Sequence, residues 1–428
     1  SIVQYVRDAR FKDFGMGVCD IGSKIYWKSA KEIPAYLDMI ANTIGWPNVA
    51  LVGHNLKFDA FILRHVYEVV PGQFIDTKGM AKAVLGKSVK GHSLALLAEH
   101  YGLESKGVML TEGKNVLTAF EEAQLAEYCL HDVFLCREIY SRLAKEFPQS
   151  QYEALHRTIA MFVSPKLELN VPLLQQTSTQ EATRRANIFA EIGIAKTEFS
   201  SNVKFPALLL SRGYEVPTKP SPRRKDESGS PVQIPALALG DPEFLELLEG
   251  SNEELRTLCE ARVAAKSTLL ETRSTKMANI GATGLWPFDV EFSGADQTHR
   301  FSGGPGAGGN PQNFTRGSAL RTAVQAPEGH SLVVGDFSNI ELRIVAFLSK
   351  DPGLVQSINN GTDIYCDFAS VFYGRRITAA DKEERRFGKT AILGLGYGMG
   401  ATKFIKTVRV QTGQTISEAD SKKAVELY

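Results

Sequence analysis

Short apolar runs and longer amphipathic stretches alternate along the N-terminal third of the chain. The runs Phe14–Val18 and Val49–Val52 have the length of buried strands. Residues 31–40 and 94–99 carry apolar side chains at helical spacing, so we predict helices there. Because strands alternate with helices, the pattern predicts an α/β domain over residues 1–150.

Helical periodicity dominates beyond this domain, with one clear interruption. Residues 151 to about 200 are mostly helical, and residues 241–277 form further long helical stretches. Between them, residues 217–235 (PTKPSPRRKDESGSPVQIP) are rich in proline, serine and charge, which predicts an exposed loop.

A strand-to-helix turn is predicted around Asp336. Leu332–Gly335 is a short apolar run that predicts a buried strand with Asp336 at its carboxyl end. Ser338 and Glu341 have the spacing of a helix capping box, and an apolar helical pattern follows. Such a carboxylate can hold Mg²⁺ through its oxygen atoms. For this segment alone, however, a helix-capping aspartate explains the pattern more simply.

Four residues of the segment RRFGKTAILGLGYG recur at every fourth position: Arg385, Lys389, Leu393 and Tyr397. On a helix such a series drifts by only about 40° per step, so the four side chains share a broad face. The two cations suit a phosphate tail, the apolar side chain suits a sugar, and the phenol suits a base. A solvated basic turn followed by a core stripe fits the spacing equally well.

Two weaker patterns lie in the α/β domain. A strand-like run ends in Asn55-Leu-Lys-Phe-Asp59, and Tyr128 precedes Asp132 by four residues in an amphipathic stretch. On a helix, that spacing places the phenol beside the carboxylate. Each pattern alone is usually structural.

Composition narrows the class of protein only moderately. The chain of 428 residues is 43% hydrophobic and 23% charged, which is typical of globular domains. Its net charge of +1 means that nucleic acid would have to be bound by local basic clusters. No apolar stretch approaches the roughly 20 residues that span a membrane. Five scattered cysteines without C-x-x-C spacing indicate reduced thiols, and the histidines show no zinc-binding pattern.

The C-terminal segments resemble family A DNA polymerases. Residues 336–343 (DFSNIELR) are similar to motif A of that family, and residues 385–398 are similar to motif B. Residues 298–302 (THRFS) and 312–316 (QNFTR) resemble its primer-template segment. The order and spacing of the blocks fit the family, so they support one another.

The two N-terminal patterns resemble the second and third motifs of DEDDy-type 3′–5′ exonucleases, which are often joined to family A polymerases. The resemblance implies an α/β ribonuclease H-like exonuclease domain followed by a right-hand polymerase domain of α+β class. It assigns residues 1–150 to the exonuclease and 151–215 to a helical connector. It assigns residues 216–290 to a helical thumb, 291–360 to a palm with an antiparallel sheet, and 361–428 to helical fingers.

For the polymerase, the resemblance implies two Mg²⁺ ions held by Asp336 and the carbonyl of Phe337. Arg385 and Lys389 would bind the triphosphate of a dNTP, and Tyr397 would stack near the template base. Glu341 would exclude a 2′-hydroxyl group, which favours deoxynucleotides. Further residues expected around the incoming nucleotide are Ser338, Asn339, Ile340 and Leu393.

Leu393 departs from the aromatic residue that is commoner at its position in the family. Leucine occurs there in some viral relatives, and we predict discrimination against dideoxynucleotides. The tight connection between the domains, without an apparent separate 5′-nuclease, resembles bacteriophage replicative enzymes more than bacterial repair polymerases.

DNA contacts are expected in two places. The primer-template segment would contribute Arg300, Gln312 and Asn313. On a helical projection, Arg262, Lys266 and Arg273 fall within about 40° of one another. In the thumb, such a stripe would grip the minor groove through contacts that carry little sequence information. A solvated helix face explains the stripe equally well.

For the exonuclease, the resemblance implies that Asp59 and Asp132 hold Mg²⁺ and that Tyr128 orients the attacking water. Asn55 would position a frayed primer end. The family's first motif, Asp-x-Glu, does not occur in residues 1–50, and a His-Asp-Glu motif does not follow motif B. We therefore expect the sequence to be truncated at both ends, the alternative being a lineage that has lost both elements.

The sequence predicts a DNA-templated DNA polymerase with a proofreading 3′–5′ exonuclease. Its expected partners are primer-template DNA, dNTPs and a replicative helicase, primase or processivity factor, without a membrane. The expected location is the cytoplasm, which would be the host cytoplasm for a phage enzyme. Two alternatives remain open: a catalytically incomplete DNA-binding remnant of a polymerase, and an exonuclease whose polymerase half serves as a clamp.

Overall fold

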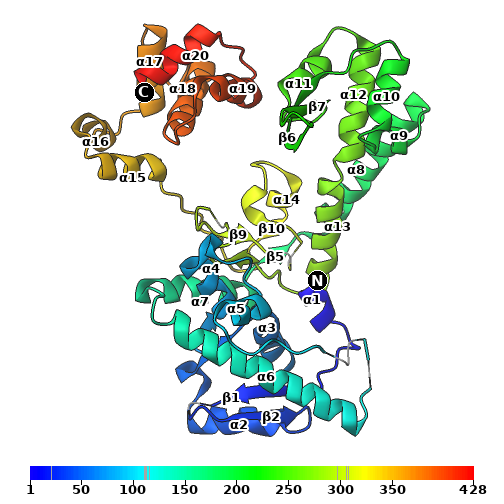
Figure 1. Cartoon of the computed structure of the whole chain (residues 1–428), viewed down its shortest axis with the longest axis vertical. Helices are drawn as coiled ribbons and strands as arrows, with labels where there is room; N and C mark the ends of the chain where they lie inside the picture. The colour runs from blue at the N-terminus through cyan, green and yellow to red at the C-terminus, as the bar shows by residue number, and fades with distance from the viewer. Residues whose placement is uncertain (21, 110–112, 115, 296, 305, 307) are drawn as a thin grey trace. The chain divides into compact units, whose positions relative to one another are not determined.

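The computed structural model describes residues 1–20, 22–109, 113, 114, 116–295, 297–304, 306 and 308–428 (Figure 1). These residues form two compact units. The first unit contains residues 1–183 and 269–332, and the second contains residues 184–268 and 333–428.

The N-terminal part of the first unit has the alternation of strands and helices that the sequence predicts. Strand β1 (Gly15–Cys19) pairs antiparallel with β2 (Ile25–Ser29), and β3 (Ala50–Gly53) pairs parallel with β4 (Gln73–Asp76). The helices of this part are α1 (Ile2–Val6), α2 (Ile33–Thr43), α3 (Lys57–Val66), α4 (Thr77–Val84), α5 (Leu94–His100) and α6 (Ala119–Leu143). The predicted strands and helices are thus confirmed.

The rest of the first unit packs onto α3. Its helices are α7 (Tyr152–Val163), the start of α8 (Val171–Ile192), α13 (Leu269–Gly281) and α14 (Ala319–Thr322). Short strands pair antiparallel, β5 (Glu168–Leu169) with β10 (Val324–Gln325) and β8 (Val290–Glu291) with β9 (Ser302–Gly303). One apolar core joins Phe61 of α3 to Phe162 of α7 and to the fully buried Trp286. Exonuclease-like elements therefore share a core with the segments that follow them.

Two groups of helices make up the second unit. One contains the end of α8 with α9 (Lys196–Ser200), α10 (Lys204–Ser211), α11 (Pro242–Glu249) and α12 (Glu253–Lys266). The other contains α15 (Ile340–Ser349), α16 (Pro352–Asn359), α17 (Ile364–Tyr373), α18 (Lys382–Leu395), α19 (Ala401–Thr412) and α20 (Glu418–Leu427). Phe372, Phe387 and Phe404 form the centre of this second group.

The predicted exposed loop at residues 217–235 is wrong in part, because most of it is a hairpin. Strand β6 (Thr218–Lys225) pairs antiparallel with β7 (Pro231–Pro235), and the register shifts between Pro220 and Lys225. The prolines did not prevent pairing because a hairpin of two strands has an open edge on each side. The segment is nevertheless largely exposed, as predicted.

Two predictions around Asp336 are wrong. Leu332–Gly335 is not a strand, because no neighbouring strand pairs with it among the described residues, and Val333 remains 91% exposed. The capping box is absent as well: α15 begins at Ile340, and Asn339, at φ 53°, is its N-cap residue without a side-chain cap. The left-handed Asn339 moves Ser338 outside the helix, so its hydroxyl cannot cap the first turn.

Candidate functional site

The turn from β3 to α3 carries the segment that resembles the second exonuclease motif. Asn55 adopts a left-handed conformation with φ 59°, and the buried Leu56 precedes the first helical residue. The carboxylate of Asp76 accepts the backbone N–H of Asn55 at 2.7 Å and that of Leu56 at 3.3 Å. Asp59 follows in the first turn of α3. A carboxylate at the end of β4 thus holds the turn that carries Asn55 and Asp59.

Asp76 also caps its own helix. Its side chain accepts the backbone N–H groups of Lys78 and Gly79, the usual bonds of an aspartate N-cap. Asp76 was not among the residues predicted from the sequence. The sequence pattern that could have indicated Asp76 is an apolar run that ends in this residue and is followed by a helical pattern. Because β3 and β4 are parallel, their carboxyl ends meet at one edge of the sheet, which places Asp76 beside the turn after β3.

Asp59 and Asp132 lie close enough for their charges to interact. Asp59 is exposed on one side but otherwise surrounded by protein. The resulting desolvation, together with the charges of Asp76 and Asp132, raises the pKa of Asp59 to about 6. Carboxylates gathered in this way favour a cation between them. The structure therefore brings together the two aspartates that the sequence predicted as metal ligands.

Tyr128 and Asp132 lie one turn apart on α6, and both contact Lys106. The Nζ atom of Lys106 lies 2.9 Å from Asp132 Oδ2 and 5.2 Å from the centre of the Tyr128 ring. Burial lowers the pKa of Lys106, but hydrogen bonds to Tyr128 and Asp132 outweigh this effect and raise it overall. The predicted pairing of phenol and carboxylate on one helix face is confirmed, and Lys106 is a neighbour that the sequence analysis missed.

A divalent cation fits these residues in part. Asp132 Oδ1 is buried and accepts no hydrogen bond from the described residues, which leaves a lone pair for a ligand. The described part of the chain contains no group of three or more histidine, cysteine or acidic side chains that could hold a metal ion. Asp59 and Asp132 are therefore two candidate ligands, and the described residues do not complete a metal site around them.

The predicted stripe on α18 is confirmed over three of its four residues. Arg385, Lys389 and Leu393 lie on the helix, whereas Tyr397 follows two residues after its end. Arg385 is ion-paired with Asp363, at 2.6 Å between Nε and Oδ2, and its guanidinium lies 5.5 Å from the centre of the Tyr365 ring.

Lys389 and Tyr397 are exposed, and Leu393 is half-buried. The other side of α18 packs into the core through Phe387, Ala391 and Leu395. The stripe is thus a face that a ligand can reach, with its first cation fixed by an aspartate.

Asp336 lies in an exposed segment of the same unit. Phe337 and Ser338 are exposed too, Ile340 begins α15, and Glu341 lies half-buried in its first turn. The amide oxygen of Asn339 accepts a hydrogen bond from the hydroxyl of Tyr365 at 2.9 Å, which ties the motif A segment to α17. Within the described ranges, Asp336 belongs to no group of three or more histidine, cysteine or acidic side chains that could hold a metal ion.

The predicted primer-template residues belong to the first unit. Arg300, Gln312 and Asn313 are exposed, the last two in the short turn Pro311–Asn313. Between them runs the glycine-rich segment 301–310, of which Pro305 and Ala307 lie outside the described residues.

A buried aspartate fixes this glycine-rich segment. Asp289 Oδ2 accepts the backbone N–H of Gly306 at 2.6 Å, and its backbone oxygen accepts that of Gly304 at 3.0 Å. A Cβ atom at Gly304 would lie 2.1 Å from the Asp289 carboxylate, so only glycine fits there. Lys57 of α3 donates to Asp289 Oδ1 at 2.6 Å and to the backbone oxygen of Val290 at 2.8 Å.

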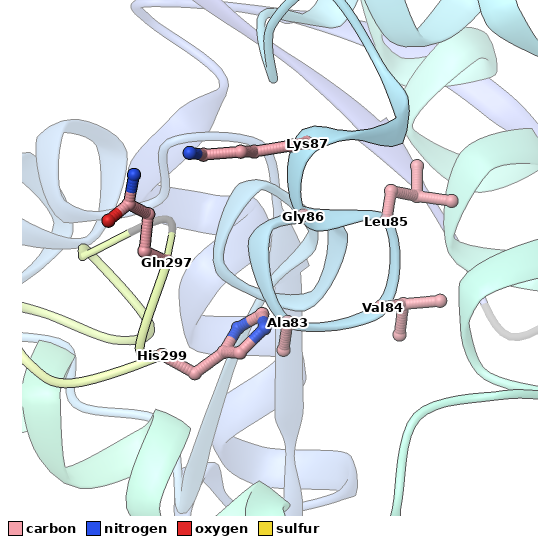
Figure 2. Close-up of a pocket in the computed structure, with 7 residues that line it drawn as sticks. All are labelled: Ala83, Val84, Leu85, Gly86, Lys87, Gln297 and His299. Atoms are coloured by element: carbon pink, nitrogen blue, oxygen red, sulfur yellow. The ribbon is translucent and has the colours of Figure 1, made fainter. Parts of the chain in front are cut away.

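A pocket lies beside the loop that leads to Arg300 (Figure 2). It is lined by residues 83–87, from the end of α4 and the turn after it, and by Gln297 and His299. In Figure 2 the side chains of Lys87 and Gln297 extend toward one another, and the His299 ring lies near Ala83. Nδ1 of His299 lies 2.8 Å from the Ser293 hydroxyl, which fixes the ring. The pocket combines hydrogen-bonding groups with a short apolar wall.

The predicted stripe of Arg262, Lys266 and Arg273 is wrong as a single helix face, because α12 ends at Lys266 and α13 begins at Leu269. Arg262 is buried, and its guanidinium donates to the backbone oxygen of Ser201 at 2.9 Å and to Asn202 Oδ1 at 2.6 Å. It stabilises the end of α9. Lys266 is exposed, and Arg273 is half-buried.

Among the described helices none is long and apolar enough to cross a membrane.

Two families match separate parts of the chain. Residues 21–148 match the family described as 3'-5' exonuclease, and residues 304–428 match the family described as DNA polymerase family A. The first range contains Asp59, Tyr128 and Asp132, and the second contains Asp336 and the α18 stripe.

Curated relatives are bacterial enzymes. DNA polymerase I of Aquifex aeolicus is 27% identical over 398 residues, which cover 86% of this chain and 64% of the relative. DNA polymerase I of Synechocystis sp. is 26% identical over 409 residues, which cover 91% of this chain and 39% of the relative. The chain thus spans less than two thirds of the length of either relative. The predicted similarity to bacteriophage enzymes stays a prediction.

A solved structure, the POL domain of Pol1 from M. smegmatis in complex with DNA primer-template and dNTP, has a similar fold. The TM-score is 0.67 at 20% identity, and the match covers 96% of this chain and 69% of that one. The predicted fold class, an exonuclease domain followed by a right-hand polymerase domain, is confirmed. The chain thus matches family A DNA polymerases over residues 304–428 and 3'-5' exonucleases over residues 21–148.

Proposed function

We propose that the protein extends a DNA primer on a template with dNTPs and removes mispaired 3′ ends with its exonuclease domain. The observation that carries the proposal is the α18 face, where Lys389 and Tyr397 are exposed beside an Arg385 that Asp363 holds in place. This face lies within the range that matches family A. The relatives named DNA polymerase I support the same activity.

In the polymerase reaction, Lys389 and Arg385 bind the triphosphate of the incoming dNTP. Their charges stabilise the negative charge that develops on the leaving pyrophosphate. Leu393 lies one turn further along the face and contacts the sugar, and Tyr397 stacks near the template base. Glu341 lies beside the sugar and excludes a 2′-hydroxyl group.

Asp336 contributes a carboxylate to Mg²⁺ binding together with the Phe337 carbonyl, and Ser338, Asn339 and Ile340 line the nucleotide side of the same segment. The described residues do not by themselves complete this metal site. We therefore assign no step of the polymerase reaction to the ion.

For the exonuclease reaction, Asp59 and Asp132 would hold Mg²⁺, and the bound ion would supply a Lewis acid that favours attack of water on a phosphodiester. Tyr128 orients that water, and Asn55 contacts the frayed strand. Unpaired ends are the natural substrate because a mispaired end unstacks at lower cost.

Primer-template DNA is the proposed partner, as it is in the solved complex of the M. smegmatis POL domain. Arg300, Gln312 and Asn313 would contact it from the first unit, and Lys266 and Arg273 remain candidate phosphate contacts. For Arg262 we propose a structural role, because its Nη1 and Nη2 atoms already donate to protein oxygens. A helicase, primase or processivity factor and a cytoplasmic location stay predictions.

The test is dNTP-dependent binding of a primer-template measured by fluorescence anisotropy, with a primer that ends in a dideoxynucleotide. The next complementary dNTP should tighten DNA binding to the wild type, and Lys389→Met should remove the gain. Lys403→Met removes an equal charge from the exposed surface of α19 and serves as the control. Binding of DNA without any dNTP effect would instead favour the alternative of a DNA-binding remnant.

A further inference from the structure

Lys106 lies between α5 and α6, outside both exonuclease-like motifs, yet its ammonium contacts the two α6 residues of the third motif. It is 2.9 Å from Asp132 Oδ2 and 5.2 Å from the centre of the Tyr128 ring. The side chains of Lys106 and Asp132 are only 28% and 23% exposed. This contact is therefore more sheltered from solvent than an ordinary surface ion pair.

The two oxygens of Asp132 have different surroundings. Oδ2 faces the Lys106 ammonium, whereas Oδ1 is buried without a hydrogen bond from any described residue. Asp59 adds a second carboxylate nearby. The pair of aspartates carries more negative charge than one ammonium balances, and Oδ1 is left to accept a further cation.

We propose that Lys106 is a built-in cation of the exonuclease site, which partly neutralises Asp132 and competes with a divalent ion for the negative charge of the two aspartates. The inference rests on the proposed exonuclease function and deepens it. A divalent ion attracts the two carboxylates more strongly than an ammonium does. The cation–π contact with the Tyr128 ring helps to hold the ammonium beside Asp132.

Binding of Mn²⁺, measured by electron paramagnetic resonance of the free ion, tests the proposal without relying on nuclease activity. Lys106→Met removes the competing charge, so Mn²⁺ should bind about fivefold more tightly or better. Lys106→Arg keeps the charge and should bind Mn²⁺ about as the wild type does. Lys90→Met, which removes a lysine 82% exposed and 3.4 Å from Glu99, should leave Mn²⁺ affinity unchanged.

Asp132→Asn distinguishes a failure of the role proposed for Lys106 from a failure of the metal site proposed for Asp132. If Asp132→Asn weakens Mn²⁺ binding but Lys106→Met leaves it unchanged or weaker, the built-in cation is refuted and the metal site stands. If neither variant differs from the wild type, the metal site proposed for Asp132 fails, and the role of Lys106 fails with it. Thermal unfolding of each variant shows whether the fold is retained, and Lys106→Arg gives the charge comparison should Lys106→Met not fold.

Discussion

The buried ion pair between Lys57 and Asp289 gives the sharpest prediction about stability. Lys57 begins α3, two residues before Asp59, and Asp289 precedes β8 and holds the glycine-rich segment. The side chains are 16% and 3% exposed, with 2.6 Å between Nζ and Oδ1. Lys57→Met would leave the Asp289 carboxylate buried without its counter-charge, so we expect a loss of about 3–5 kcal/mol in the free energy of unfolding.

The loss should be largely reversed in the double variant Lys57→Met with Asp289→Asn. An asparagine can still accept the N–H of Gly306 but leaves no buried charge, so the remaining cost should be about 1–2 kcal/mol. Urea unfolding followed by circular dichroism measures both values. Lys90→Met, at the surface, should cost less than about 0.5 kcal/mol. A Lys57→Met midpoint equal to that of Lys90→Met would refute the reasoning.

Three further predictions concern the candidate sites. Asp76→Ala removes the acceptor of four backbone N–H groups, so the free energy of unfolding in urea should fall by about 1–3 kcal/mol and single-strand binding should weaken. Asp76→Asn should lower both less. The pKa of Asp59, raised to about 6, means that the folded state holds its proton more tightly than the unfolded state. Its contribution to stability therefore falls as pH rises from about 4 to 6, and Asp59→Asn should gain stability over the wild type across that window in urea titrations; a constant difference would contradict the shift. Leu393→Tyr should raise the incorporation of dideoxynucleotides relative to dNTPs on a sequencing-type gel, and equal ratios in both proteins would refute the role of Leu393.

Local patterns were enough to predict the elements that carry the motifs. The four-residue spacing of Tyr128 and Asp132 and of Arg385, Lys389 and Leu393 needs only a helix, and both helices form. The Leu332–Gly335 strand failed because a strand also needs a neighbour, which no local pattern provides.

The residues that the sequence analysis missed act through contacts distant in sequence. Lys57 and Asp289 are 232 positions apart, and Asp76 reaches Asn55 across 21 positions. Lys106 lies in a segment without periodicity, and nothing in its neighbours marks it as a contact of Asp132. Arg262, in contrast, was predicted from its helical spacing to contact DNA, but its guanidinium donates to a backbone carbonyl of the protein.

Primer extension tests the central claim most directly. A labelled primer-template is incubated with Mg²⁺, with and without dNTPs, using the wild type, Asp336→Asn and Asp132→Asn. The account predicts extension that disappears in Asp336→Asn, and shortening without dNTPs that disappears only in Asp132→Asn. Extension by Asp336→Asn at the wild-type rate would contradict the polymerase assignment, and primer shortening unaffected by Asp132→Asn would contradict the exonuclease site.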